Sequence, residues 1–241
     1  ADNDVRTLKR QLRLHTVGPG LYASSNFANL TPEDQHRLRA HAVSTRFRGV
    51  VALSHQSAAL LHGAATWQQD LSRVHVTRLD TGRGRHQAGV AHHVAQLPSS
   101  EVCEVDGLLV TNPARTAWDI AVASSIESGL ATVDSFKYGN LVTDDELLEL
   151  VTRYSSWRGA RRAKLTLSLS TELAESPGES RTRFLFRQAG IPQPILQYRV
   201  EEASGRLIGI TDFAWPEFRL LGEFDGMVKY GKPEDLGKEK V

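Results

Sequence analysis

The sequence contains a single cysteine, Cys103, among its 241 residues. One cysteine cannot form an intramolecular disulfide or a zinc site built from several thiolates. Its neighbours alternate between apolar and polar residues, which favours a small, half-buried strand residue over a nucleophile. The low cysteine content fits a reduced, cytoplasmic setting.

Long apolar runs are also missing from the sequence. No stretch approaches the roughly 20 apolar residues that a membrane-spanning helix requires, so we expect no membrane partner. The chain opens on Ala-Asp-Asn-Asp, which is the opposite of a secretory signal. It does not begin with methionine, so we expect that some N-terminal sequence has been lost.

Neither sign of charge is in excess, because 29 Lys and Arg residues face 28 Asp and Glu residues, for a net charge of +1. Binding to nucleic acid must therefore depend on local basic patches. The apolar fraction of 40% and the charged fraction of 24% are ordinary for a folded protein, which argues against wholesale disorder. The length predicts two domains.

The N-terminal segment combines a basic helix pattern with a turn and a strand. Residues 5–14 have helical periodicity, residues 18–20 form a Gly-Pro-Gly turn, and residues 21–23 follow as a strand. Four cations share one face of the helix: Arg6, Lys9, Arg10 and Arg13. This order is typical of the back half of a winged-helix domain, and the cations would contact DNA phosphates. A solvated amphipathic helix is the alternative.

The middle of the chain mixes helices and strands. Capping residues and apolar periodicity predict helices over 31–47, 54–61, 112–123 and 143–154, and strands over 74–77, 90–94 and 108–111. Arg83, Arg85 and His86 lie on a glycine-rich loop that could hold the DNA backbone or could simply be mobile. A basic cluster near residue 160, which we expect to contact phosphates, marks the predicted domain boundary: Arg158, Arg161, Arg162 and Lys164. A helix crosses this boundary and reaches residue 173.

Histidines and one arginine of this region have competing interpretations. His55 and His62 face the same way on their predicted helix, but the sequence indicates no third ligand, which favours a packing role over a metal site. His92 and His93 point to opposite faces of a strand, which argues against a shared site. Arg115 has Asp119 four residues later, so a structural ion pair is favoured over a phosphate contact.

Acidic residues recur in the last third of the chain. Glu179 begins a helix, Asp212 lies toward the end of the second of two paired strands (196–200 and 207–215), and a third strand covers 218–224. Glu223 and Asp225 would share one face of that strand, so the acids can converge on Mg²⁺ or Mn²⁺. A metal-bound water would then attack a phosphodiester.

Each of these acids also has a structural alternative. Asp212 could be an ordinary acid at a strand end. Glu223 sits in an apolar run where an unpaired carboxylate is costly to bury, although an ion pair with Arg219 or Arg183 would account for it.

Three ordered motifs of this region resemble a nuclease family. They are Glu-Ser-Pro-Gly-Glu-Ser-Arg-Thr-Arg at 175–183, Asp-Phe-Ala-Trp-Pro at 212–216, and Glu-Phe-Asp-Gly at 223–226 with Lys-Tyr at 229–230. The resemblance is to the Vsr-like branch of the PD-(D/E)xK endonucleases. It implies a restriction-endonuclease-like fold over residues 161–241 that is clipped at its C-terminus. Its implied catalytic residues are Glu179, Asp212, Glu223, Asp225 and Lys229, with the metal held by Asp212, Glu223 and Asp225.

Residues 1–160 resemble a second family more loosely. The matching stretches are 20–23, 52–58, 62–63 and 107–119. They are similar to the AbiEi antitoxins of the abortive-infection (type IV) toxin–antitoxin systems. That family joins an N-terminal winged helix to an α/β domain and represses its own promoter. The resemblance implies DNA and a cognate toxin as partners.

Together these observations predict an α+β, multidomain chain. We expect a partial winged-helix segment over 1–28, an AbiEi-like α/β domain over 29–160 and an incomplete nuclease-like α/β domain over 161–241. The leading function hypothesis is a metal-dependent DNA endonuclease or nickase. The alternative is a non-catalytic, DNA-binding, antitoxin-like transcriptional regulator whose nuclease-like domain is a scaffold. A third class is an interaction protein that binds no nucleic acid.

Overall fold

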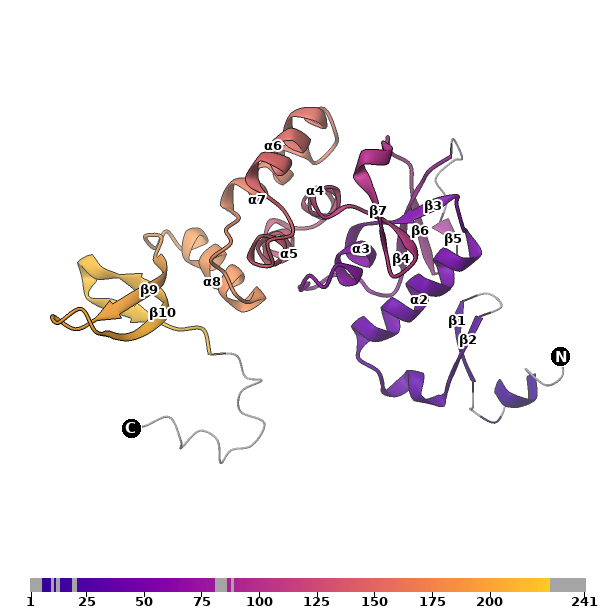
Figure 1. Cartoon of the computed structure of the whole chain (residues 1–241), viewed down its shortest axis with the longest axis horizontal. Helices are drawn as coiled ribbons and strands as arrows, with labels where there is room; N and C mark the ends of the chain where they lie inside the picture. The colour runs from indigo at the N-terminus through magenta and orange to yellow at the C-terminus, as the bar shows by residue number, and fades with distance from the viewer. Residues whose placement is uncertain are drawn as a thin grey trace.

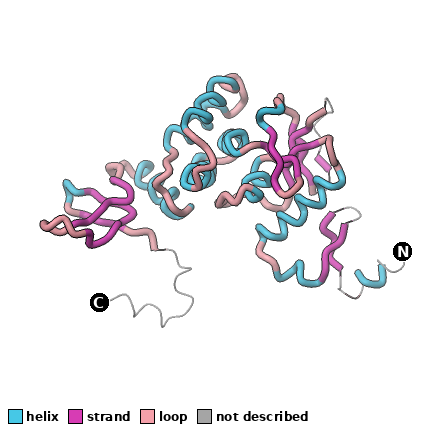
Figure 2. Tube along the Cα trace, in the orientation of Figure 1, coloured by secondary structure: helices cyan, strands magenta, loops and turns pink. Residues whose placement is uncertain are grey.

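The structure, a computed structural model, describes residues 6–9, 11, 14–18, 21–80, 86–87 and 89–225. These residues form an α+β arrangement with a mixed sheet, a group of helices and a second small sheet (Figure 1). The strands gather toward the two ends of the described chain, and the helices of residues 113–188 lie between the central sheet and the C-terminal sheet (Figure 2). The α+β prediction is therefore confirmed.

The N-terminal part is a hairpin. Strand β1 (Leu14–Gly18) pairs antiparallel with β2 (Leu21–Ser24), and the 3-10 helix η1 (Ser25–Asn29) follows. Residues 6–9 are helical. The helix predicted over 5–14 is too long, because Leu14 pairs with Ser24 as the first residue of β1. The helix and hairpin have the predicted order, and the winged-helix assignment stays a prediction.

The central sheet has six strands in the order β5-β6-β4-β3-β8-β7. The strands are β3 (Val51–Leu53), β4 (Val74–Arg78), β5 (His86–Gln87), β6 (Val90–His93), β7 (Val102–Val105) and β8 (Leu108–Thr111). The β3–β8 and β4–β6 pairs are parallel, and the β3–β4, β5–β6 and β7–β8 pairs are antiparallel.

Two helices contribute to the core of this sheet. Thr31 caps α2 (Pro32–Arg46) by accepting the amide hydrogen of Asp34, and the short α3 (His55–Leu61) follows β3. Ala40, Val43 and Ala58 of these helices join the buried valines and leucines of the strands in one apolar cluster.

A group of four helices forms a second core. They are α4 (Pro113–Ala123), α5 (Ile126–Tyr138), α6 (Asp144–Arg153) and α7 (Ala160–Leu169), and η2 (Ser99–Glu101) precedes β7. Trp118 and Phe136 are buried at its centre. Asn112 and Thr143 cap α4 and α6 as predicted, the latter in a capping box.

The end of this helical group differs from the prediction. The helix expected to reach residue 173 ends at Leu169. Ala160 and Ala163 of α7 are buried in the helical core, so the predicted boundary at residue 160 falls at the first residue of an element that packs against α4 and α5.

The C-terminal part begins with α8 (Pro177–Gln188) and continues into a three-stranded antiparallel sheet in the order β11-β10-β9. Its strands are β9 (Ile195–Glu201), β10 (Leu207–Trp215) and β11 (Leu220–Gly222), with η3 (Pro216–Phe218) before β11. The predicted meander of three strands is confirmed. The third strand is shorter than predicted, because residues 216–218 form a 3-10 turn and Arg219 adopts a left-handed conformation with φ of 53°.

Helix α8 packs against α5 through two arginines. Arg183 pairs with Asp134 at 2.8 Å, and Arg181 pairs with Glu127 at 2.7 Å. The Arg181 guanidinium also lies 3.8 Å from the centre of the Trp67 ring. These contacts connect the C-terminal part to the helical group.

Candidate functional site

Glu179 lies in the first turn of α8 and is buried, with 7% of its surface exposed. Its carboxylate accepts hydrogen bonds from the Ser176 hydroxyl at 2.7 Å and from the Glu175 amide at 2.9 Å, while the Ser176 oxygen accepts from the Glu179 amide. Burial raises the pKa of Glu179, and the charge of Asp212 acts in the same direction. Glu179 therefore stabilises the start of the helix as well as facing a second acid.

Asp212 is half-buried on β10. Its carboxylate accepts the amide hydrogen of Phe224 at 2.7 Å, and the Phe224 ring lies over Gly178, where any side chain would clash with it. These contacts hold the segment after β11 against the start of α8. The structure thus brings Asp212 near Glu179.

Glu223 and Asp225 do not occupy the positions that the sequence predicts. Strand β11 ends at Gly222, so the alternation of side chains along a strand does not align the two acids, and both are exposed. Glu223 therefore carries no burial cost that an ion pair would have to offset, and Arg183, one of the two partners considered for it, pairs with Asp134.

The acids do not gather into a metal centre in this structure. Over the described ranges, no three acidic side chains place their ligand atoms within 4.8 Å of one another. Lys229 lies outside the described residues. The catalytic and metal roles of these residues stay predictions.

The predicted nucleic-acid contacts fall into two groups. Near residue 160, Arg158, Arg161 and Lys164 are exposed, while Arg162 donates a hydrogen bond to the Val122 carbonyl at the end of α4. At the N-terminus, Arg6 is exposed and the Lys9 ammonium lies 4.3 Å from the centre of the Tyr22 ring. The other cations predicted there and on the loop after β4 lie outside the described side chains: Arg10, Arg13, Arg83, Arg85 and His86.

Arg115 is fully buried and forms ion pairs with two carboxylates, which confirms its predicted structural role. Its Nε donates to Asp119 at 2.9 Å, and its Nη1 donates to Glu101 and to the Gln96 carbonyl. Tyr154 donates its hydroxyl hydrogen to the same Glu101 at 2.8 Å. This network joins η2 to α4 and α6 and leaves Arg115 no access to a phosphate.

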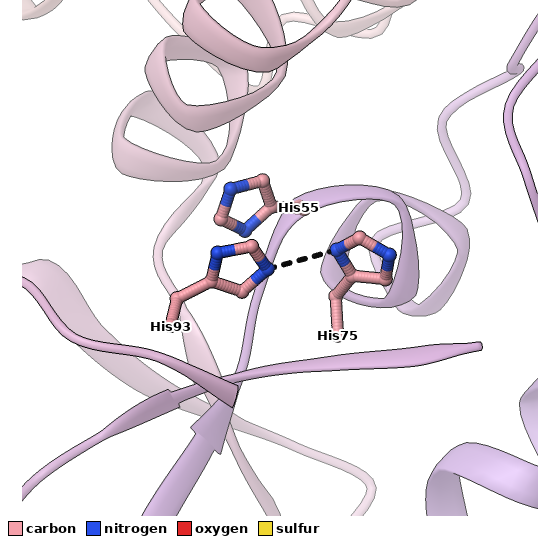
Figure 3. Close-up of side chains that lie close together, drawn as sticks. All are labelled: His55, His75 and His93. Atoms are coloured by element: carbon pink, nitrogen blue, oxygen red, sulfur yellow. Dashed lines mark hydrogen bonds between the residues drawn. The ribbon is translucent and has the colours of Figure 1, made fainter. Parts of the chain in front are cut away.

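A cluster of three histidines lies at strands β4 and β6 of the central sheet and at the start of α3 (Figure 3). His55 is the first residue of α3, His75 belongs to β4 and His93 ends β6. Their rings come together so that one nitrogen of each lies within 4.8 Å of the other two. His75 Nδ1 and His93 Nε2 are 2.9 Å apart, and the His55 and His93 rings stack at 3.9 Å between centres.

The surroundings hold the pKa values of His55 and His75 below the ordinary value. Burial lowers the pKa of His55 well below its ordinary value and that of His75 to about 4, and the neighbouring histidines lower both further. His75 Nε2 lies 2.8 Å from the Gln56 amide nitrogen, and His55 Nδ1 lies 3.0 Å from the Ser54 hydroxyl. At neutral pH the His55 and His75 rings are therefore in the neutral form, in which one nitrogen carries a proton and the other a lone pair.

The histidine cluster opens onto a pocket of about 380 Å³ between the sheet and the junction of α4 and α5. His75 and His93 line it, together with Gln56, Gln69 and Ser128. Gln69 donates to the hydroxyls of Ser124 and Ser128, which fixes the helical side of the pocket. The walls are polar and bear both signs of charge, since Asp70 and Arg73 also line the pocket.

Sequence reasoning missed this cluster because it sought a partner for His55 on the same helix. His62 instead binds the Thr111 carbonyl at 2.8 Å, which confirms its packing role. The signal lay in the parallel pairing of β4 with β6, where His75 is opposite Ala91 and His93 lies two residues further along the same face. That pairing cannot be deduced from residue spacing alone.

Comparisons with known proteins match this architecture. Residues 50–169, from just before β3 to the end of α7, match the family model described as the AbiEi antitoxin C-terminal domain. The uncharacterized proteins MT2308 and Rv2248 of two Mycobacterium tuberculosis strains are each 30% identical over 223 residues, which cover 92% of this chain and 77% of theirs. Among the described helices, none is long and apolar enough to cross a membrane.

One solved structure aligns with most of the chain. It is the RV2827C protein of Mycobacterium tuberculosis, with a TM-score of 0.43 and 18% identity over 91% of this chain and 78% of that one. The two relatives and the matched domain identify the family by themselves. The chain therefore belongs to the family of these mycobacterial proteins, and its residues 50–169 match the AbiEi antitoxin C-terminal domain.

Proposed function

We propose that this chain is a non-catalytic, DNA-binding regulator of the antitoxin type that acts with a cognate toxin. The observation that carries the proposal is the match to the antitoxin domain, which covers the helical core and the strands of the sheet core. An antitoxin requires a toxin as its partner, and the family resemblance adds repression of a promoter.

The start of α7 is the part of the described surface that best suits phosphate contact. Arg158 and Arg161 are exposed, and within the described chain neither forms an ion pair with a carboxylate. Lys164, three residues after Arg161, lines a groove with Asp144 and Asp145, so its attraction for a phosphate is weaker. The two arginines are therefore the residues to test.

Changing both Arg158 and Arg161 to glutamine is expected to weaken DNA binding and to reduce its salt dependence. Each lost phosphate contact makes the negative slope of log K against log salt less steep by about 0.9. Fluorescence anisotropy with DNA from upstream of the protein's own gene, between about 50 and 200 mM salt, measures both quantities.

A matched control keeps the same loss of charge elsewhere. Arg199 and Arg206 are exposed on and after β9, and their change to glutamine should leave the slope unaltered. An equal slope for the Arg158/Arg161 variant and the wild type would exclude α7 as the contact. Absence of salt-dependent DNA binding in the wild type would reject the regulator proposal.

A metal-dependent nuclease is the second candidate, and the proximity of Glu179 to Asp212 favours it. In this proposal Asp212, Glu223 and Asp225 would hold Mg²⁺ or Mn²⁺, and the ion would supply the activation of water needed to hydrolyse a phosphodiester of DNA. The exposed positions of Glu223 and Asp225 weigh against it.

Titration of Mn²⁺ by calorimetry tests the nuclease proposal. Asp212→Ala is expected to abolish the binding, while Glu217→Ala, which removes an exposed acid just after the same strand, is expected to retain it. Binding that survives in Asp212→Ala, or no binding in the wild type, would remove the nuclease from consideration.

A further inference from the structure

We propose that His55, His75 and His93 bind one divalent transition-metal ion of the class that prefers imidazole ligands, with Zn²⁺ as the main candidate. The site belongs to the antitoxin domain but is separate from the surface proposed to contact DNA. Its test therefore does not depend on whether the chain binds DNA or cleaves it.

The spacing of the three rings fits the coordination geometry of zinc. A Zn–N bond of about 2.0–2.1 Å at a tetrahedral angle separates ligand nitrogens by about 3.3 Å. The nitrogens of the cluster already lie within 4.8 Å of one another, and two are 2.9 Å apart. The His55 and His93 rings are stacked, so they must rotate out of this stack before their in-plane lone pairs meet at one ion.

The donor set selects the class of metal. Imidazole nitrogens suit Zn²⁺, Cu²⁺, Ni²⁺ and Fe²⁺, whereas Mg²⁺ and Ca²⁺ require oxygen ligands. In the described part of the chain the set contains no carboxylate or thiolate. The site is therefore chemically distinct from the acidic pair Glu179 and Asp212.

Groups behind the rings can orient them for metal binding. The Ser54 hydroxyl holds Nδ1 of His55, which leaves Nε2 for the metal. Gln56 lies against Nε2 of His75. With the metal on Nδ1 of His75, the proton moves to Nε2, and the Gln56 amide nitrogen, which also donates to the Asp70 carbonyl at 3.0 Å, must move away from that nitrogen.

The backbone at His55 provides an independent observation. This residue has φ of 53°, a left-handed conformation that is strained for a non-glycine residue. The strain is kept at a buried position where it turns the ring toward His75 and His93. Strained residues of this kind concentrate at ligand-binding sites.

The pocket gives the metal an open position. Three protein ligands leave one coordination site of a tetrahedral ion for water or an exogenous ligand. His75 and His93 line the pocket of about 380 Å³, which supplies the space for that ligand. The proposed site is therefore accessible to exchange rather than closed.

Spectroscopy and calorimetry with the full, untagged chain test the site. Co²⁺ and Zn²⁺ are expected to bind at one equivalent, and X-ray absorption at the zinc edge should give three nitrogen ligands of imidazole type at about 2.0–2.1 Å. His93→Gln and His75→Gln should each lower the affinity at least about 100-fold, because loss of an outer-shell partner alone costs about 10–100-fold.

His41→Gln is the matched control, since His41 is half-buried on α2 and is not part of the cluster. It should bind zinc as the wild type does. Circular dichroism establishes that each variant is folded, and if neither cluster variant folds, the absorption spectrum of the wild type decides. Oxygen-only coordination, wild-type affinity in folded His93→Gln, or no binding in the wild type would overturn the proposal.

Discussion

Arg115→Met is expected to lower the free energy of unfolding by about 3–5 kcal/mol, because it leaves buried carboxylates without their counter-charge. Arg115 has no exposed surface, and the carboxylates of Glu101 and Asp119 on either side of it are also buried. Methionine fills a similar volume, so the lost stability comes mainly from the missing positive charge and not from a cavity. Urea denaturation measures it.

The same variant should change how stability depends on pH. Burial raises the pKa of Asp119 from 3.8 to about 6 even though Arg115 opposes the shift. Removing Arg115 raises that pKa further. The folded state then binds the Asp119 proton more tightly than the unfolded state does. Protonated Asp119 therefore contributes its full stabilisation below about pH 4, and this stabilisation is lost as the pH rises through the pKa of the folded state. Arg115→Met should therefore be less destabilised at pH 5 than at pH 8.

Arg153→Met is the matched control for this network. Arg153 also pairs with Glu101, at 2.6 Å, but its side chain is 45% exposed. An exposed ion pair contributes about 1 kcal/mol or less, so the control should lose much less stability. If Arg115→Met and Arg153→Met lost equal amounts of unfolding free energy, the burial of Arg115 would not be the reason that its ion pairs stabilise the fold.

Arg183→Met is expected to weaken the packing of α8 against α5 and to lower the free energy of detaching α8 by about 3–5 kcal/mol. Arg183 binds the Asp134 carboxylate and the Leu169 carbonyl, and Asp134 is 1% exposed. Without the guanidinium, Asp134 keeps the amide of Thr171 but no opposite charge. Hydrogen exchange should accelerate in α8 and the following sheet while α4 stays protected.

Arg187→Met tests whether this effect is specific. Arg187 lies one turn later on the same helix and is exposed. Its substitution should leave exchange in α8 unchanged. If Arg183→Met also left exchange unchanged, the ion pair with Asp134 would not be the contact that holds α8.

Local signals in the sequence predicted the starts of the helices. Thr31, Asn112, Thr143 and Ser176 each accept an amide hydrogen two or three residues later, as a capping residue does. The helix α5 was not predicted, because its small residues provide a weak apolar stripe. Gly129 fits there because its backbone lies close to Ala121 and to the Thr166 side chain.

The candidate sites depend on contacts that cannot be predicted from the spacing of residues along the sequence. The predicted alignment of Glu223 with Asp225 assumed a strand through residue 224, but β11 ends at Gly222. The histidine cluster needs the pairing of β4 with β6 and a left-handed residue at the start of α3. By contrast, Arg115 and Asp119 are four residues apart on one helix, so their ion pair could be predicted.

The Arg183–Asp134 pair has a consequence for where the antitoxin domain ends. Sequence comparison closes the domain at residue 169, yet Asp134 inside it takes its counter-ion from residue 183. A fragment that stopped at residue 169 would seal a carboxylate away from water with no cation beside it. The domain defined by sequence similarity is therefore shorter than the segment that must fold together to neutralise Asp134. That segment extends into the second turn of α8, where Arg183 lies.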